Sequence, residues 1–307
     1  MSIIASENIV YDHASIARRQ LLHEISKAAR KLVPAGWLDE LEFEYRYRRY
    51  IAEYGESDSD IYISTFSKSG TTWTQLILYQ LTTDGDMDFD HLFDVSPWLW
   101  YAAQRRVEPA HPPQPRLLKS HDDYRRFKNG RRGRFLFVVR DGPDVCLSLF
   151  HHRRNFKRYT GSFEEHFEDF LHGTEYNWFD HLRAWLLNGY GLNLQVIKFE
   201  DLKNDFAATV RSIADFCEIE LDEERLLKTS ERCSFTAMKE HEARLGPRNS
   251  HFEGVKDAPY EVKHADQFIR KGDVGEGRAS LTTSQLRAYR DRFDRALGDI
   301  EIIANYR

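Results

Sequence analysis

The stretch Ile61–Leu81, IYISTFSKSGTTWTQLILYQL, decides the fold. Its first part, Ile61–Phe66, is β-branched and aromatic, which predicts a strand. A turn of small residues, Ser67–Gly70, comes next, and Thr71–Leu81 has the apolar face of a helix. The first N–H groups of a helix are unpaired and lie at the positive end of its dipole, so they attract anions. The stretch therefore predicts a strand–loop–helix that cradles a phosphate.

The composition of this loop narrows the kind of phosphate site. Gly70 permits close approach of the backbone to an anion, Lys68 adds a positive charge, and hydroxyls come from Ser69, Thr71 and Thr72. The order of residues does not match the Walker pattern G-x-x-x-x-G-K-[ST], because Lys68 precedes the glycine. The magnesium-binding logic of nucleoside triphosphatases is therefore missing. Taken alone, the same residues also suit an ordinary helix cap.

Strands and helices alternate through the rest of the chain, which predicts an α/β fold. A mainly parallel central sheet, flanked by helices on both faces, follows from short strands rich in Val, Ile, Leu and Phe. Ligands of such sheets bind at the carboxyl ends of the strands. Further strands are expected at 116–119, 134–139 and 194–199, and helices at 14–32, 37–54, 143–157, 177–188, 205–217 and 283–296.

Composition limits the classes of protein. Among 307 residues, 44 are Lys or Arg and 49 are Asp or Glu, and the net charge of −5 argues against generic nucleic-acid binding. The three cysteines, Cys146, Cys217 and Cys233, fit neither a disulfide framework nor a zinc site, which indicates a reducing compartment. No secretory apolar segment is visible, and no stretch approaches the ~18 apolar residues of a membrane span. We expect a soluble, cytoplasmic protein.

The domain organisation is expected to be simple. The chain shows no internal repeat and no low-complexity linker, so residues 1–307 are predicted to form a single domain. Residues 1–34 are expected to be a helical extension at the amino terminus. Residues 240–280 contain few periodic apolar residues and many charges and glycines, which predicts a mobile loop that closes over a ligand.

A second motif, Lys119-Ser120-His121, follows a predicted strand. Residues two apart in an extended chain point to the same face, so Lys119 and His121 are expected to face one cleft. A histidine of near-neutral pKa acts as a general base, and a lysine neutralises developing negative charge. A surface lysine beside a loop histidine is the alternative.

Two further motifs carry cations. Arg140 ends a predicted buried strand, and Ser148 lies in the helix that begins near Pro143. The guanidinium of Arg140 offers forked donors that suit a phosphate. Near the carboxyl terminus, Arg270-Lys271-Gly272 also suits a phosphate-gripping loop, although a solvated charge pair is the simpler interpretation.

These four motifs, in this order, resemble the cytosolic-type sulfotransferase family, which uses 3′-phosphoadenosine 5′-phosphosulfate (PAPS). Three segments between them, Trp178–Trp185, Lys198–Leu202 and Ser234–Lys239, are also similar to family segments. The resemblance covers about residues 35–297. It implies PAPS as the donor, no required metal, and a P-loop-like phosphosulfate-binding loop.

The resemblance also implies individual roles. His121 would take the proton of the acceptor, and Lys68 and Lys119 would stabilise the sulfuryl group in transfer; Ser148 is assigned to both the catalytic and the donor-binding set. The residues implied to bind the donor are Lys68, Ser69, Gly70, Thr71 and Thr72 at the 5′-phosphosulfate, Trp73, Phe199 and Phe235 near the nucleoside, and Arg140, Ser148, Arg270, Lys271 and Gly272 at the 3′-phosphate.

The chain departs from the family pattern at several positions. Phe199 stands where the family often has Tyr, Cys233 where Thr is frequent, and Gly277 where Trp is usual. The short dimerisation motif of the family would fall at Arg278–Arg287 and is matched at Thr282 only, so the oligomeric state stays open.

The acceptor is the least determined part. Aromatic residues suggest a pocket for a small molecule with a hydroxyl or amine, and they fit the protein core equally well. They are Trp98, Trp100, Tyr101, Phe150, His152 and Phe156. Two other functions stay open: a nucleotide kinase or other phosphotransferase, which would use the same strand–loop–helix, and a nucleotide-binding protein without activity.

Overall fold

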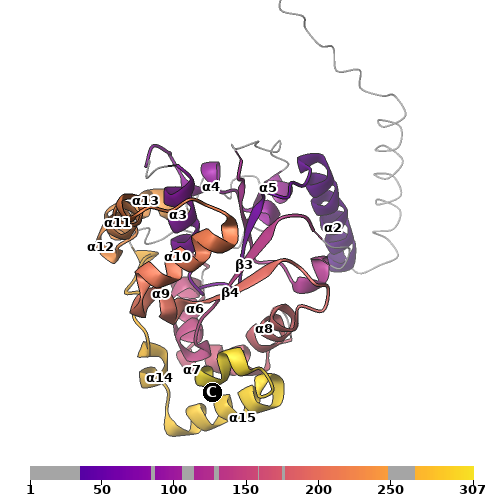
Figure 1. The fold of residues 1–307 in the computed structure, drawn as a ribbon. Coiled ribbons are helices and arrows are strands. Elements are labelled where there is room, and N and C mark those ends of the chain that lie inside the picture. Colours follow the sequence, from indigo (N-terminus) through magenta and orange to yellow (C-terminus); the bar gives the residue numbers. More distant parts are fainter. Residues whose placement is uncertain are drawn as a thin grey trace, which may run out of the picture. The chain divides into compact units, whose positions relative to one another are not determined.

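The computed structural model describes residues 35–83, 87–105, 114–127, 131–157, 159–174, 177–247 and 267–307 (Figure 1). The chain divides into two compact units, residues 1–50 and 51–307, and the division falls within helix α2 (Ala35–Tyr54). The predicted helix at 14–32 lies outside the described residues. The arrangement of residues 1–307 as a single domain stays a prediction.

The second unit is built on a sheet of four parallel strands in the order β2-β1-β3-β4, which confirms the predicted parallel sheet. Ile61 pairs with Leu117 on one side and with Arg134 on the other, so β1 is a central strand. The strands are β1 (Ile61–Thr65), β2 (Leu117–Ser120), β3 (Arg134–Val139) and β4 (Leu194–Lys198). β2 begins one residue later than expected, and β4 ends before Phe199.

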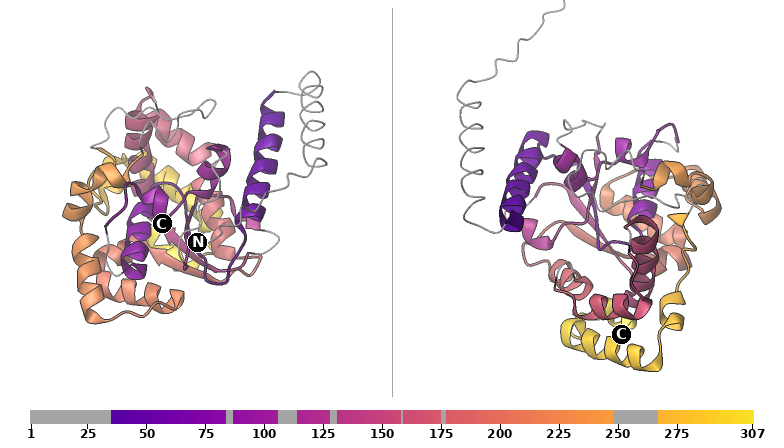
Figure 2. Two further views of the ribbon diagram at one scale, coloured as in Figure 1. Left: turned by 90° about the horizontal axis from the view of Figure 1, so that it is seen from above. Right: turned by 180° about the vertical axis from the view of Figure 1, so that it is seen from behind.

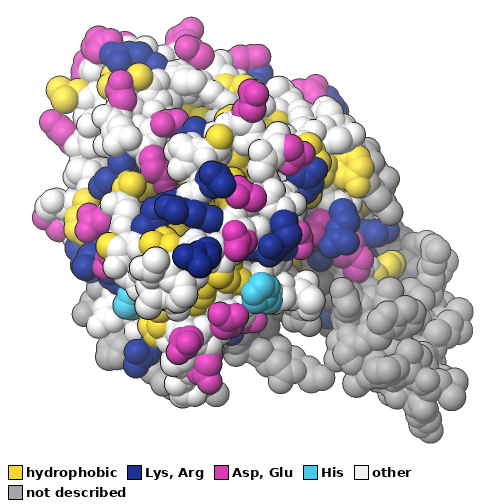
Figure 3. Space-filling view, turned by 90° about the horizontal axis from the view of Figure 1, so that it is seen from below, with side chains coloured by type: hydrophobic (Ala, Val, Ile, Leu, Met, Phe, Trp, Pro, Cys, Tyr) yellow, Lys and Arg dark blue, Asp and Glu magenta, His cyan; other side chains and the backbone are white. Residues whose placement is uncertain are grey.

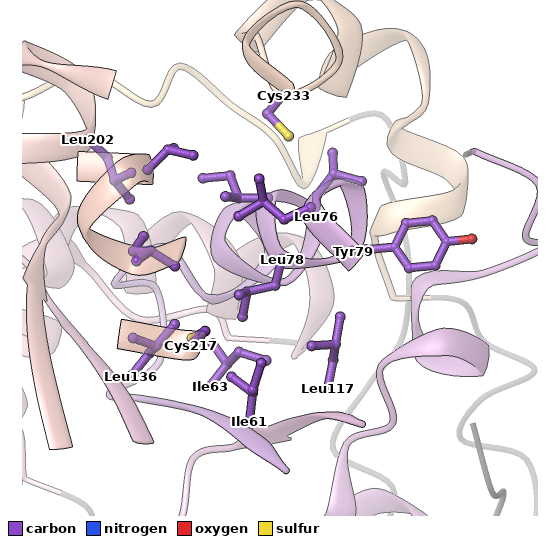
Figure 4. Packing of buried hydrophobic residues seen from close by; sticks show 14 of the residues in the cluster. Ile61, Ile63, Leu76, Leu78, Tyr79, Leu117, Leu136, Leu202, Cys217 and Cys233 are labelled. Atoms are coloured by element: carbon purple, nitrogen blue, oxygen red, sulfur yellow. The ribbon is translucent and has the colours of Figure 1, made fainter. Parts of the chain in front are cut away.

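Alternate strand residues form the core on one face of the sheet. Ile61, Ile63 and Leu136 are fully buried against apolar side chains of α3 (Thr71–Thr82), among them Leu76 and Leu78 (Figure 4). Burial of apolar surface is the main stabilising contribution here, and it fixes β1 and α3 relative to each other. The loop between these two elements is thereby held at both ends.

The opposite face of the sheet is covered by aromatic side chains. Tyr62 stacks on Phe135 with ring centroids 4.5 Å apart, and Phe137 stacks on Trp185 at 5.0 Å. Trp185 belongs to α8 (Trp178–Leu187), and helices lie on both faces of the sheet in the two views of Figure 2. The predicted flanking helices are therefore confirmed.

The expected helices form within two residues of their predicted bounds: α2, α3, α6 (Gly142–Phe156), α8, α10 (Phe206–Cys217) and α15 (Thr283–Leu297). Other helical segments are additional to the expected ones. They are α4 (Leu92–Val95), α5 (Leu99–Arg105), η1 (Tyr124–Phe127), α7 (Phe163–His172), α9 (Phe199–Asn204), α11 (Glu223–Arg232), α12 (Phe235–Glu240), α13 (Glu242–Leu245), α14 (Glu276–Ser280) and η4 (Glu301–Tyr306).

Part of the stretch 240–280 has regular structure. α13 and α14 lie within it, whereas 248–266 falls outside the described residues. Its mobility and its closure over a ligand stay predictions. Elsewhere on the surface, Lys and Arg side chains are interspersed with Asp and Glu side chains on the face shown in Figure 3.

Candidate active site

The loop between β1 and α3 reverses the chain at the carboxyl edge of the sheet. Lys68 and Gly70 both adopt positive φ angles, 70° and 107°, which turn the backbone into the helix. Gly70 occupies the N-cap position, so no side chain caps the first N–H groups of α3. A β-carbon at this position would lie 2.8 Å from a ring carbon of Phe199. The loop therefore needs glycine both for its backbone angle and for its packing.

Two buried donors at this loop suit an anion. The Oγ atom of Ser69 and the Nε atom of Arg140 are buried and have no hydrogen-bond partner among the described residues. Buried polar groups are normally paired, because an unpaired one loses its hydration without compensation. Acceptor oxygens of an anionic ligand would satisfy these donors, so Ser69 fits the expected role at the 5′-phosphosulfate and Arg140 the expected role at the 3′-phosphate.

The lysines implied in catalysis lie among aromatic rings. Lys119 is 8 % exposed, and its Nζ atom lies 4.5 Å from the ring centroid of Trp98 and 4.9 Å from that of Phe93. The Nζ atom of Lys68 lies 4.6 Å from the ring centroid of Phe268. Burial lowers the pKa of Lys119 to about 7, with the charge of Lys68 as a second cause.

Lys68 experiences the same effects. Burial lowers its pKa to about 8, and the positive charges of Arg140 and Arg270 contribute next. Both ammonium groups are buried, and the cations near them lower their pKa values; of the described residues, Glu242 is the one carboxylate that opposes this at Lys68. A negatively charged ligand would restore their charged form, so the electrostatics of this region favour an anion.

His121 follows β2 and is held against the end of β1. Its Nδ1 atom lies 3.0 Å from the carbonyl oxygen of Thr65 and 3.1 Å from the Thr65 hydroxyl, which is 2.6 Å from that of Thr71. A carbonyl oxygen only accepts hydrogen bonds, so Nδ1 carries the proton and Nε2 keeps a lone pair. Desolvation and then the charge of Lys119 lower the pKa of His121 well below its ordinary value. The imidazole is therefore neutral at physiological pH and can accept a proton at Nε2.

Arg140 links three parts of the site. It follows β3, donates through Nη2 to the carbonyl oxygen of Asp273 at 2.7 Å, and lies with Nη1 3.4 Å from that of Lys68. Its guanidinium carbon lies 4.3 Å from the ring centroid of Phe199. Burial lowers the pKa of Arg140 from its usual value. Ser148 lies further along α6 and is half-buried.

The segment Gln267–Asp273 carries the predicted motif Arg270-Lys271-Gly272. Both cations contact one carboxylate: Arg270 donates to Glu276 at 3.0 and 2.6 Å, and Lys271 donates at 2.9 Å. A β-carbon on Gly272 would lie 3.6 Å from the ring of Phe235, which is 42 % exposed. The segment therefore brings Phe235 beside the motif and leaves part of its ring open to solvent.

Two residues that sequence reasoning missed hold this segment. The buried carboxylate of Glu242 accepts from the N–H of Ile269, and Lys239 donates to Glu242 at 2.7 Å and to the carbonyl oxygen of Ile269 at 2.9 Å. The sequence contains only a Lys–Glu pair three apart as a signal, and such pairs are common on helix surfaces. Their contact with Ile269 is between segments distant in sequence.

The following helix, α14, docks on the start of α6. The Asp144 carboxylate accepts from the N–H groups of Gly275 and Gly277 at 2.8 and 2.6 Å, and Arg278 donates to Asp141 at 2.9 and 2.7 Å. A β-carbon on Gly277 would lie 2.2 Å from backbone atoms of Pro143. Gly277, a departure from the family pattern, is therefore the residue that permits this close contact.

Trp73 is held by contacts that do not need the side chain of residue 233. Its indole N–H donates to the carbonyl oxygen of Cys233 at 2.8 Å. Its ring lies 5.4 Å from that of Phe199 and 6.0 Å from that of Phe206. The departures at Phe199 and Cys233 therefore leave a packed aromatic group at the start of α3.

The aromatic residues predicted for the acceptor pocket have different neighbours in the structure. Trp98 lies with its ring 5.4 Å from that of His121, and Trp100 and Tyr101 follow within 5.3 and 6.2 Å of Trp98. His152 stacks on Phe156 at 5.0 Å and lies 6.3 Å from Phe268. Phe150 instead packs on Phe163 and His166 of α7, at 5.2 and 5.6 Å. Trp98 is thus beside His121, and Phe150 faces another helix.

No three His, Cys, Asp or Glu side chains in the described part of the chain are grouped so that they can hold a metal ion. No helix within the same residues has both the length and the apolar character needed to cross a membrane.

Comparison with solved structures gives the fold. The chain superimposes on mouse sulfotransferase SULT7A1 complexed with PAP with a TM-score of 0.62 and 19 % identity, covering 83 % of this chain and 90 % of that one. Retinol dehydratase in complex with androsterone and inactive cofactor PAP gives the same TM-score and identity, over 83 % and 85 %. At this level of identity the likeness concerns the fold.

Comparison of sequences gives the family. Rabbit (Oryctolagus cuniculus) amine sulfotransferase is 30 % identical over 249 residues, which are 78 % of this chain and 79 % of the relative. Human sulfotransferase 2A1 is 28 % identical over 267 residues, 82 % of this chain and 89 % of the relative. Residues 58–301 match the family model described as a sulfotransferase domain. The chain therefore belongs to the sulfotransferase family, and the enzyme class predicted from its four motifs is confirmed.

Proposed function

We propose that this sulfotransferase moves a sulfuryl group from PAPS to a hydroxyl or amine of a small-molecule acceptor, with His121 as the general base. The observation that carries the proposal is the setting of His121. Thr65, at the end of β1, fixes the tautomer of the imidazole, and Lys119, two residues before His121, is the charged residue with the largest effect on its pKa. A base and a cation at one edge of the sheet are what sulfuryl transfer needs.

The donor side is supported by the loop and by the cations around it. The uncapped first turn of α3, the unpaired Oγ of Ser69 and the ammonium of Lys68 would bind the phosphosulfate end. Arg140 would reach the nucleotide through its buried and unpaired Nε atom. Mouse SULT7A1 and retinol dehydratase, which share the fold, were both solved with PAP. PAP is the product that PAPS leaves after transfer.

In the proposed reaction, one bond to sulfur forms while another breaks. The acceptor oxygen or nitrogen forms a bond to sulfur as its proton moves to Nε2 of His121. The bond between sulfur and the bridging phosphate oxygen breaks, and the electron pair stays on the 5′-phosphate. Lys68 and Lys119 would stabilise the negative charge that grows on these oxygens, since hydrogen-bond donors and cations in a dry site act strongly on developing charge.

The acceptor side is supported by the aromatic residues beside His121. Trp98 lies against both His121 and Lys119, and Phe93 covers Lys119 from another direction. An apolar molecule with one reactive hydroxyl or amine would bind here through its apolar surface. One relative is an amine sulfotransferase, and one structural neighbour was solved with androsterone.

The test compares two histidine variants with PAPS and a panel of phenols, alcohols and amines. His121→Ala is expected to lower turnover about 10²–10⁴-fold, the usual contribution of general acid–base catalysis. Its affinity for adenosine 3′,5′-bisphosphate should stay within about threefold, because the nucleotide contacts other residues. The control, His172→Ala, removes an exposed histidine at the end of α7 and should leave both quantities unchanged.

The alternatives give other results. Unchanged turnover in His121→Ala would reject the base. Magnesium-dependent ATP turnover without any response to PAPS would indicate a phosphotransferase. Stabilisation by the bisphosphate with no product from the panel would indicate a nucleotide-binding protein without activity.

A further inference from the structure

The two cations of the Arg270-Lys271-Gly272 motif already have an anionic partner within the chain. Both terminal nitrogens of Arg270 donate to the two carboxylate oxygens of Glu276, and the ammonium of Lys271 donates to one of them. Glu276 and Arg270 are each 27 % exposed, so this is a half-buried pair with two-point geometry. Charge-assisted pairs of this geometry are the stronger ones.

The backbone on either side of Glu276 is fixed. Gly275 and Gly277 donate their N–H groups to Asp144, and Gly277 has no free space against the backbone of Pro143. The Arg278–Asp141 pair holds the next residue to the same turn of α6. The carboxylate of Glu276 consequently stays within side-chain reach of both cations, and rotation of side chains is enough to open the contact.

A nucleotide phosphate would need the same donors. Arg270 uses both of its Nη atoms on Glu276, and a phosphate dianion in contact with a carboxylate experiences like-charge repulsion. Hydrogen bonds from Arg270, and after them from Lys271, hold the pKa of Glu276 at about 2 against the effect of burial. The carboxylate is therefore ionised in the free enzyme, and a glutamate without these donors also has an ordinary pKa well below physiological pH.

We propose that Glu276 is an internal competitor of the nucleotide's 3′-phosphate for Arg270 and Lys271. This inference rests on the proposed function, in which these cations bind that phosphate. Nucleotide binding then displaces the carboxylate from Arg270 and Lys271, and the ion pairs form again when the product is released. Glu276 thereby weakens binding of adenosine 3′,5′-bisphosphate and speeds its dissociation, and it leaves contacts with the 5′-phosphate unaffected.

The test uses two nucleotides that differ only in the 3′-phosphate. Wild type and Glu276→Gln are titrated with adenosine 3′,5′-bisphosphate and with adenosine 5′-monophosphate by calorimetry, and bisphosphate dissociation is followed by stopped flow. In Glu276→Gln the bisphosphate should bind about tenfold tighter and dissociate more slowly, the size expected for a half-buried charge interaction. The affinity for the monophosphate should change less than about twofold.

Two further variants control the experiment. Glu231→Gln removes one negative charge from the exposed end of α11 and should change neither affinity. Glu276→Asp keeps the charge on a side chain one methylene shorter, which weakens its hold on the cations, and should tighten bisphosphate binding by about threefold. It provides a second measurement if the Gln variant is less stable.

The outcomes separate the two proposals. Bisphosphate binding that is unchanged or weaker in Glu276→Gln would overturn the competitor role; weaker binding would show that the carboxylate positions the cations for the phosphate. If wild type binds both nucleotides equally, Arg270 and Lys271 do not bind a 3′-phosphate, and that part of the proposed function fails independently of Glu276.

Discussion

The two chain segments that bring Lys68 and Arg270 to the candidate active site are held in different ways. The loop Phe66–Gly70 continues a central strand and leads into a helix packed on the core, so backbone pairing and apolar burial place Lys68. The segment 267–280 contains no strand, and carboxylates hold it in place. Glu242 accepts a hydrogen bond from Ile269, and Asp144 and Asp141 accept hydrogen bonds from Gly275 and Arg278 at α14. The difference indicates that one half of the proposed donor site is fixed by the fold and the other by ion pairs and close packing.

The largest expected effect comes from a substitution in the segment 267–280, at the close contact of Gly277 with Pro143. In Gly277→Ala the new methyl group would lie 2.2 Å from backbone atoms of Pro143, and backbone cannot move aside cheaply. We expect a loss of about 3 kcal/mol in the free energy of unfolding, at the upper end for overpacking. Urea denaturation measures it.

This variant also tests which half depends on α14. Binding of adenosine 3′,5′-bisphosphate should weaken much more than binding of adenosine 5′-monophosphate, because the 5′-phosphate loop is held independently. Gly189→Ala is the matched control, since a β-carbon there meets nothing within 4 Å. Equal weakening of both nucleotides would mean that the two halves are not independent.

A smaller effect is expected from breaking the first half. Gly70→Ala would place a β-carbon at a φ of 107° and 2.8 Å from the ring of Phe199. Left-handed backbone costs a non-glycine residue about 1–2 kcal/mol, and the Phe199 ring can move partly aside. The free energy of unfolding should fall by that amount in denaturation experiments. Both nucleotides should bind more weakly, because they share the 5′-phosphate.

The control for this variant separates backbone strain from packing. Gly55 also has a positive φ, 71°, and a β-carbon there meets nothing within 4 Å. Gly55→Ala should therefore show the backbone cost in denaturation and leave nucleotide binding unchanged. If Gly70→Ala weakened the bisphosphate alone, the assignment of the loop to the 5′ end would be wrong.

The same difference between the two segments explains what the sequence predicted. Strand–loop–helix order and the parallel sheet follow from local patterns, so β1, the loop and α3 were found nearly to the residue. Local patterns do not predict the contacts that hold the segment of Arg270, because the contact of Ile269 with Glu242 and that of α14 with Asp144 join residues distant in sequence. In sequence, Gly277 is a departure from the family pattern. In the structure, its close contact with the backbone of Pro143 explains why a glycine stands there.

The helices that the sequence analysis did not predict show a further limit of prediction from local sequence patterns. α7 begins with a capping box from Ser162 to Glu165, which the sequence displays as S-x-x-E. α13 is only four residues long, and so short a helix has no periodicity to detect. The sequence groups Phe150 with Trp98 because both are aromatic, and in the structure Phe150 packs on Phe163 of α7. The neighbours of a helix side chain depend on which other helix packs against it, and a local sequence pattern does not show this.

The smallest expected effect is a dependence of nucleotide affinity on pH. It concerns Lys68, in the loop after β1, and Lys119, in the neighbouring strand β2. In the free enzyme the pKa is about 8 for Lys68 and about 7 for Lys119, lowered first by burial. A bound anion favours the ammonium form and raises both pKa values, so binding is accompanied by proton uptake when the pH exceeds them. Affinity for adenosine 3′,5′-bisphosphate should therefore fall as the pH rises.

Calorimetry at about pH 7 and pH 8 should show that the affinity falls by at most about tenfold over this range if both lysines take up protons. Heats measured in two buffers of different ionisation enthalpy give the number of protons. Lys119→Arg is the informative variant, because a guanidinium stays charged over this range and should flatten the profile. An affinity independent of pH in the wild type would show that neither lysine changes its charge on binding, and that Lys68 and Lys119 already have counter-ions in the free enzyme.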